Sequence, residues 1–344
     1  MSPWSYIVRR GLQSGCDKTL SIVPAAKAAL IFQRLTARLK PCPTKPGVLT
    51  HALWRIFLIV CAVLLAGCSP PRGRTIVIGS KNFTEQIILA ELFAQQIEAH
   101  TALHVDRRVN LGGTLICHGA LLAGQLDLYP EYTGTALTAI LKEPLKEGEQ
   151  SSGVLQTVRE EYHKQFGVEV MPPLGFNNTF AIIVRGDDAT KLHLRIVSDT
   201  QPYAAHWRVG VGYEFLDRPD GYRGWTAAYG LHFSGEPRIL DLGLLYRALA
   251  ERQVDVVAGN STDGTIAALS MTALEDDRHY FPPYEAVPLV REATLEKHPE
   301  IRAALEALSG KISEEEMRHL NYEVDGEHRD PAVVVRAFRQ SQGF

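Results

Sequence analysis

Two short segments of the chain carry most of the residues that could bind a small molecule. The first, Lys81–Gln86, follows the apolar run Thr75–Gly79, and the second, Tyr129–Thr135, follows a shorter apolar stretch. Each segment lies where a predicted strand ends, and open α/β sheets bind ligands at the carboxyl ends of their strands. These polar and aromatic side chains therefore predict a ligand site. The alternative is that an isolated tyrosine at such a position is half-buried packing.

The pattern around these segments alternates strands with helices. A strand over Thr75–Gly79 precedes a helix over Thr84–His100, whose apolar residues recur on one face and whose predicted N-cap is Thr84. A strand within 103–109, a helix over Thr114–Leu122 and a strand over Leu126–Tyr129 follow. The resulting βαβαβ order is typical of a parallel sheet with right-handed crossovers.

A second α/β unit is predicted over residues 180–283. Its expected strands are Phe180–Val184, Arg208–Gly212, Arg238–Leu240 and Val254–Val257, and its expected helices are Tyr222–Tyr229 and Leu242–Glu251. A further strand over Val287–Val290 and helices over 299–308, 313–322 and 331–340 are predicted after it.

The N-terminal region reads as targeting sequence. Residues 51–67 combine a weakly basic start with an apolar run that is too short to span a bilayer comfortably, which indicates a secretory signal peptide. Leu65–Cys68 resembles the bacterial lipobox, so Cys68 is the expected lipidation site and residues 68–74 a lipidated linker. The alternative is an uncleaved anchor with a chance cysteine. Residues 1–50 are predicted to be a disordered leader, or to precede a true translation start near Val48 or Leu49.

Composition excludes several classes of function. The chain has 344 residues and a formal charge of −3, with no basic block beyond the N-terminal region, so nucleic acid is not an expected partner. Four of the five cysteines lie at or before Cys68, which excludes a disulfide framework in the processed chain and leaves Cys117 as a buried helical residue. No Walker loop, Gly-x-Ser-x-Gly elbow or His-Glu-x-x-His motif is present, so neither an enzyme nor a cofactor or metal site is expected.

The segments Ile76–Thr101 and Asn110–Leu137 closely resemble the solute-binding proteins of osmoprotectant ABC importers. Later matching stretches are Gly175–Thr179, Asp241–Tyr246, Ser261–Gly264, Phe281–Tyr284 and Leu320–Asp325. The resemblance implies an α/β fold of the type II periplasmic-binding-protein class, with two lobes, two crossover strands and the ligand in the interlobe cleft. It places residues 75–179 and 284–344 in one lobe and 180–283 in the other.

The resemblance also implies a quaternary-ammonium ligand, of the glycine betaine, choline or carnitine kind. Such a cation has no hydrogen to donate, so proteins hold it against aromatic faces at about 0.5–2 kcal/mol per ring. The family's cage positions fall on Tyr132, Phe180 and Tyr246, whereas the fourth position falls on Leu269 and Ser270, which supply no ring.

For the anionic end of a ligand, the family pattern points to Lys81, Thr135 and Arg218, with Gln86 and Asn178 as further candidates. Two of these residues have simpler interpretations. Lys81 could form a salt bridge with Glu85, and Arg218 could be a solvated turn residue.

The function implied by the resemblance is extracytoplasmic capture of an osmolyte and its delivery to the permease and ATPase subunits of an importer, with attachment to the membrane through a lipid anchor. Two alternatives stay open: a sensor lipoprotein, or a binding protein for a different amine such as ergothioneine. The sequence leaves open the exact ligand, the membrane that carries the lipid and the oligomeric state.

Overall fold

The computed structural model of the chain describes residues 75–145 and 150–344. The predicted leader (1–50), signal peptide (51–67), lipidated Cys68 and linker (68–74) lie outside these residues. Within the described part of the chain, no helix is both long and apolar enough to cross a membrane.

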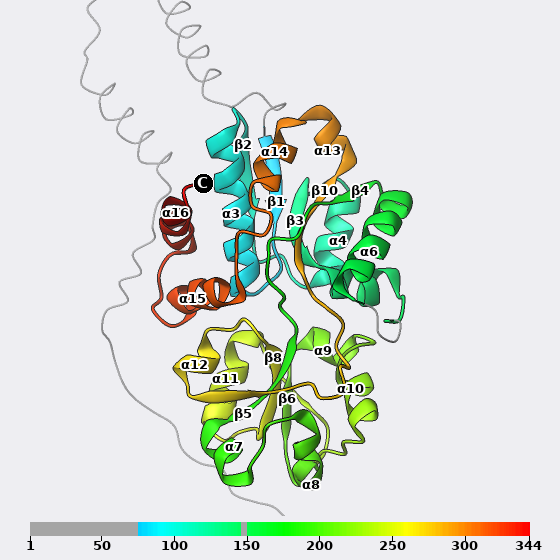
Figure 1. Cartoon of the computed structure of the whole chain (residues 1–344), viewed down its shortest axis with the longest axis vertical. Coiled ribbons are helices and arrows are strands. Elements are labelled where there is room, and N and C mark those ends of the chain that lie inside the picture. Colours follow the sequence, from blue (N-terminus) through cyan, green and yellow to red (C-terminus); the bar gives the residue numbers. More distant parts are fainter. Residues whose placement is uncertain (1–74, 146–149) are drawn as a thin grey trace, which may run out of the picture. The chain divides into compact units, whose positions relative to one another are not determined.

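The described chain forms two five-stranded sheets, each covered by helices (Figure 1). The first sheet has the order β2-β1-β3-β10-β4, with β1 at Thr75–Gly79, β2 at His104–Arg108, β3 at Leu128–Tyr132, β4 at Val168–Val170 and β10 at Ala286–Arg291. The second has the order β7-β6-β8-β5-β9, with β5 at Phe180–Arg185, β6 at Val209–Val211, β7 at Arg238–Ile239, β8 at Val256–Asn260 and β9 at Met271–Leu274. We call each sheet with its helices a lobe, so the predicted two-lobe α/β fold is confirmed.

The helices divide between the lobes in the same way. The first lobe contains α3 (Thr84–His100), α4 (Thr114–Leu122), α5 (Thr133–Thr135), the π-helix η1 (Ala136–Leu141), α6 (Ser151–Phe166), α13 (Glu292–Lys297), α14 (Glu300–Glu306), α15 (Glu314–Asp325) and α16 (Pro331–Gln342). The second contains α7 (Gly186–Leu192), the 3₁₀ helix η2 (Val197–Thr200), α8 (Gln201–Ala204), α9 (Tyr213–Asp217), α10 (Tyr222–Tyr229), α11 (Leu242–Ala250) and α12 (Thr265–Ala268).

The first three strands of the first sheet are parallel, as their βαβαβ order predicts, but two local predictions are wrong. Strand β3 does not end at Tyr129. It continues to Tyr132 because β10 pairs antiparallel along its whole length, with Tyr132 opposite Ala286. Thr84 is not the N-cap of α3 either: Phe83 holds that position, and the Thr84 hydroxyl donates instead to Asp325, 2.5 Å away.

Helix α3 is buried on nearly every side, and not only on the apolar face that the sequence shows. It lies between the first sheet and the C-terminal helices α14, α15 and α16 (Figure 1). Its polar residues find partners there. Glu91 pairs with Arg107, and the Gln95 amide donates to the Ala332 carbonyl at 2.9 Å. The C-terminal helices α14, α15 and α16 therefore complete the core around α3.

The chain crosses between the lobes twice, through residues 171–179 and 275–285. These two connecting segments pair with each other, since Asn177 and Glu285 form an antiparallel bridge and the backbone N–H of Asn178 donates to the Tyr284 carbonyl at 3.0 Å. Side chains on these segments are therefore held at the junction of the two lobes.

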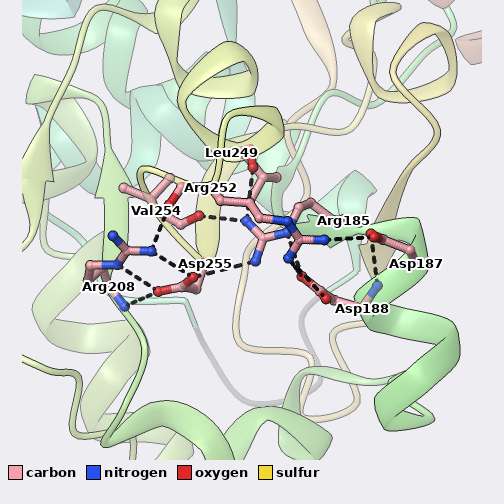
Figure 2. Close-up of polar contacts among 8 residues, drawn as sticks. All are labelled: Arg185, Asp187, Asp188, Arg208, Leu249, Arg252, Val254 and Asp255. Carbon is pink, nitrogen blue, oxygen red and sulfur yellow. Dashed lines mark hydrogen bonds and ion pairs between the residues drawn. The ribbon is translucent and has the colours of Figure 1, made fainter.

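A network of arginines and aspartates ties together one end of the second sheet (Figure 2). Arg185, at the end of β5, donates to the carbonyls of Leu249 and Val254 at 2.9 and 2.7 Å and to Asp188 at 2.5 Å. Asp255 also accepts from Arg208. Because Arg185 reaches backbone carbonyls on both sides of the turn between α11 and β8, it fixes that turn to β5.

Candidate ligand-binding site

A cavity of about 130 Å³ lies between the lobes, and we call it the interlobe cavity. The residues that line it are Lys81, Asn82, Phe83, Gly113, Tyr132, Thr135, Asn178, Phe180, Gly212, Tyr213, Glu214, Phe215, Arg218, Asp241, Leu242, Ala258, Asn260 and Tyr284. They come from both sheets and from both connecting segments. The cavity therefore exists only where the two lobes meet.

The wall that the first lobe contributes is built around Lys81, which lies two residues after β1 and is only 2% exposed. Its ammonium donates to the Thr114 hydroxyl at 3.1 Å and pairs with the buried Glu131. It also lies 5.0 Å from the centroid of the Tyr132 ring, so this ring presents its face to a positive charge. The simpler interpretation of Lys81, a salt bridge with Glu85, is wrong.

Arg218 connects the two lobes on another side of the cavity. Its guanidinium donates to Asp220 at 2.8 Å and, across the lobes, to the Thr135 hydroxyl at 2.9 Å. It lies 5.0 and 5.7 Å from the ring centroids of Phe180 and Tyr284. Burial opposes ionisation of Asp220, but the hydrogen bonds and charge of Arg218 outweigh burial and lower the pKa of this carboxyl. Arg218 is thus a buried cavity residue and not a solvated turn residue.

Glu85, in the first turn of α3, accepts hydrogen bonds from four separate segments of the chain. Its Oε1 accepts from the Tyr132 hydroxyl at 2.6 Å and from the side-chain amide of Asn178 at 2.8 Å. Its Oε2 accepts from the Thr262 hydroxyl at 2.5 Å and the Asn321 amide at 3.0 Å. Burial raises the pKa of Glu85 despite these four hydrogen bonds. The carboxyl therefore links both lobes and a connecting segment.

The structure brings together six of the eight residues that the sequence indicated as ligand contacts. They are Lys81, Tyr132, Thr135, Asn178, Phe180 and Arg218. Within the described part of the chain, Gln86 and Tyr246 are not among the lining residues. Gln86 is buried behind Lys81, where its side-chain oxygen accepts from the Lys81 amide at 3.3 Å.

Tyr246 lies one layer behind the cavity wall, so the structure does not place its ring beside Tyr132 and Phe180. Its hydroxyl donates to Asp263 and accepts from the Asn260 amide at 3.3 Å. A Cβ on Gly259 of β8 would lie 2.1 Å from that hydroxyl, so the tyrosine packs directly against the strand. Tyr246 supports Asn260, which does line the cavity.

Four further rings line the cavity: Phe83, Tyr213, Phe215 and Tyr284. Phe83 stacks on Tyr132 with centroids 6.4 Å apart, and the Tyr284 hydroxyl donates to Asp220 at 2.5 Å. Tyr284 adjoins a Pro-Pro break that marks the return to the first lobe, which was the available signal. The position of Leu269, where a fourth cage ring was expected, lies outside the lining.

Taken together, the cavity offers aromatic faces and two buried cations, each already paired with a carboxylate. Aromatic faces attract a diffuse positive charge, and guanidinium and ammonium groups bind carboxylates. This combination suits recognition of a small molecule that carries both an apolar cation and a polar end.

Comparisons with known proteins agree with this architecture. Residues 74–341 match the family described as the substrate-binding domain of ABC-type glycine betaine transport systems. The carnitine transport binding protein of Listeria monocytogenes is 36% identical over 301 residues, which cover 85% of this chain and 96% of that protein. An ergothioneine transport permease and binding protein of Helicobacter pylori is 31% identical over 330 residues, or 95% of this chain and 58% of that protein.

A solved structure of a glycine betaine/carnitine/choline ABC transporter protein is similar in three dimensions as well. It has 34% sequence identity and a TM-score of 0.66, over 78% of this chain and 98% of that one. A family match that covers most of the chain, together with relatives above 30% identity, establishes membership. The chain therefore belongs to the family of substrate-binding domains of ABC-type glycine betaine transport systems, a transport family and not an enzyme family.

Proposed function

We propose that this protein captures a small quaternary-ammonium compound in the interlobe cavity and delivers it to the permease of an ABC importer. The observation that carries the proposal is the convergence of Tyr132, Phe180 and Tyr284 with Lys81 and Arg218 on one cavity. A trimethylammonium group would pack against the ring faces, which already hold the chain's own cations at 5.0–5.7 Å.

The polar end of the ligand would bind near Arg218. A carboxylate or hydroxyl there would meet the guanidinium and the Thr135 hydroxyl, which lie 2.9 Å apart. Asn178 adds a buried side-chain oxygen that has no hydrogen-bond partner among the described residues and can accept from a ligand hydroxyl. Lys81, Thr135, Arg218 and Asn178 thus remain our ligand contacts, while Gln86 and Tyr246 support the wall from behind.

Closing of the lobes is the mechanical step of this function. The ligand contacts both lobes, so it binds the closed arrangement more tightly than an open one and shifts the population toward it. The paired connecting segments 171–179 and 275–285 are the part of the chain that must bend.

Attachment to the membrane through a diacylglycerol on Cys68 completes the proposal. It rests on the small residues Ala66 and Gly67 ahead of the cysteine and on the apolar run before them. An anchored protein stays near the permease at the outer side of the membrane.

A thermal-shift titration of residues 69–344 tests the ligand class. Glycine betaine, choline, carnitine and ergothioneine are each added, and a true ligand at 100 times its Kd raises the stability of the fold by about 2.7 kcal/mol. Ergothioneine is included because the Helicobacter relative is named for it. If none of the four raises the unfolding temperature above that with added sodium chloride, the proposed ligand class is wrong.

A further inference from the structure

The two lobes touch across the cavity at a contact that no ligand role explains. Glu214, in α9 of the second lobe, lines the cavity, and its Oε1 accepts from the backbone amide of Thr114 in the first lobe. Its Oε2 accepts from the Thr114 hydroxyl at 3.2 Å. One carboxylate thus makes two hydrogen bonds across the lobes.

The partner of Glu214 is the N-terminus of α4, which has no cap of its own. The N-cap residue is Gly113, and it offers no side chain to the free amides of the first turn. A carboxylate at a helix N-terminus satisfies such amides and interacts favourably with the helix dipole. Glu214 therefore supplies from the second lobe the cap that α4 lacks in the first.

The fit at this contact depends on glycine. A Cβ added to Gly113 would lie 2.3 Å from Glu214 Oε1, although the backbone of Gly113, at φ −80°, suits any residue. An alanine at this position would therefore push the carboxylate away without straining α4.

The contact is also connected by hydrogen bonds to Lys81, which lines the cavity. The Thr114 hydroxyl that donates to Glu214 accepts from the Lys81 ammonium at 3.1 Å, and Lys81 is paired with Glu131. A continuous path of hydrogen bonds thus runs from the buried first lobe to α9.

No lining cation that the structure describes is left unpaired to neutralise Glu214. Among the described residues, both cavity cations are paired with other carboxylates, Lys81 with Glu131 and Arg218 with Asp220. The remaining charged lining residues are both acids: Glu214, and Asp241, which caps α11 through the Gly243 amide at 3.0 Å. Together with Glu131 and Asp220, which pair with the cations but are not lining residues, the carboxylates around the cavity number four against two cations, which favours a ligand with net positive charge.

We infer that Glu214 is the latch of the interlobe cavity: it holds the lobes together by capping α4 from the opposite lobe, and its charge makes closure favour a cationic ligand over a zwitterion. The claim that Glu214 holds the lobes together concerns closure itself. The claim that its charge favours a cationic ligand rests on the proposed ligand class.

The test of the latch separates contact from charge. Gly113→Ala blocks the contact and keeps the charge, Glu214→Ala removes both, and Asp217→Asn removes an exposed carboxylate from the same helix as the matched control. Dyes on Lys164→Cys and Lys191→Cys, which are exposed on α6 and α7, report the distance between the lobes by energy transfer. Cys117 is buried and stays unlabelled.

We expect Gly113→Ala and Glu214→Ala to lengthen the average interlobe distance without ligand, and to speed ligand dissociation about 10-fold or more, while Asp217→Asn matches the parent protein. If both variants keep the parent's distance and dissociation rate, the latch is rejected. If only Glu214→Ala has an effect, the carboxylate acts through its electrostatic field and not through the contact with α4, and the latch is likewise rejected.

Glu214→Gln tests the charge, since it keeps an acceptor for the Thr114 amide. We expect the Kd of choline, a net cation, to rise about 3-fold or more beyond any rise for glycine betaine, which is neutral overall. Equal changes for the two ligands would overturn the preference. If the parent protein binds neither compound, the proposed ligand class fails, whereas the interlobe distances still decide the latch.

Discussion

Within single residues of the cavity, the ring and the polar group serve different purposes. The ring of Tyr132 lines the cavity and faces Lys81, whereas its hydroxyl points away and donates to the buried Glu85 at 2.6 Å. Tyr284 divides in the same way, with its ring beside Arg218 and its hydroxyl on Asp220. Affinity and stability should therefore separate when only the hydroxyl is removed.

Substitution of Tyr132 tests this division. Tyr132→Phe keeps the ring, so we expect the Kd of a quaternary-ammonium ligand to change by less than about 3-fold, whereas Tyr132→Ala should raise it about 10-fold or more. Tyr132→Phe should also lower the free energy of unfolding by about 1 kcal/mol, because Glu85 loses a donor. Calorimetric titration and urea denaturation measure the two quantities. Equal losses of affinity in both variants would refute recognition by the ring face.

Asp263 makes stability depend on pH. Burial and the nearby Glu85 carboxylate raise the pKa of Asp263 to about 7, although Tyr246 and the Asn260 amide donate to it. A raised pKa means that the folded state holds a proton that the unfolded state releases near the ordinary value of 3.8. The stabilisation is therefore complete below pH 3.8 and is lost as the pH rises through about 7.

Asp263→Asn removes this titration. Across the window from about pH 4 to about pH 7, we expect the parent to lose about 2 kcal/mol of unfolding free energy relative to the variant, less than full linkage allows because the residue is only half-buried. Urea denaturation at several pH values measures the difference, and the titrating groups that do not interact with Asp263 cancel in the comparison. Parallel curves for the two proteins would contradict the assignment.

At the scale of elements, helix α11 shows what the sequence could and could not predict. Its position and length were predictable from apolar periodicity, and its first residue, Leu242, does line the cavity. Tyr246 follows four residues later, on the same face but about 6 Å further along the helix axis. That one turn takes it past the cavity wall and behind β8. Spacing alone does not reveal where along a helix a cavity ends.

For the strands, the sequence predicts position but not pairing. The buried apolar runs at β1, β5 and β10 were predictable because each is bounded by turn residues. The pairing of β10 between β3 and β4 was not predictable from these runs, because partner strands are distant in the sequence. Glu85 illustrates the consequence, since its donors come from residues as far along the chain as Thr262 and Asn321.

The arginine network of the second lobe gives a prediction about an element junction (Figure 2). Arg185→Lys replaces a planar fork that reaches two carbonyls and Asp188 by a single ammonium, so we expect the free energy of unfolding to fall by about 1–3 kcal/mol. Ligand affinity should stay unchanged, because Arg185 does not line the cavity.

Arg252→Lys is the matched control for this substitution. Arg252 belongs to the same network, but its side chain is 56% exposed, so we expect a loss below about 0.5 kcal/mol. Thermal denaturation of both variants measures the contrast. Equal effects would show that Arg185 does not fix the turn between α11 and β8.

For the molecule as a whole, the anchor and the binding site should be independent. Cys68→Ser removes the thiol that would carry the lipid, so we expect the protein to move from the membrane fraction to the soluble fraction. Its Kd for ligand should not change, since the lining residues that the structure describes fall between Lys81 and Tyr284. Membrane fractionation and titration of the released protein measure the two outcomes. Continued membrane retention of the variant would reject lipidation at this cysteine.

The place of β10 in the first sheet governs the order in which the lobes can be completed. Every strand of the second sheet comes from the continuous stretch 180–274, so that lobe is ready to assemble as soon as this stretch is available. The first sheet cannot be completed at that stage, because β10 (Ala286–Arg291), which pairs with both β3 and β4, comes later in the chain. A chain threaded from its N-terminus therefore exposes two bare strand edges until late in its emergence, the stage at which protection against aggregation and proteolysis matters most.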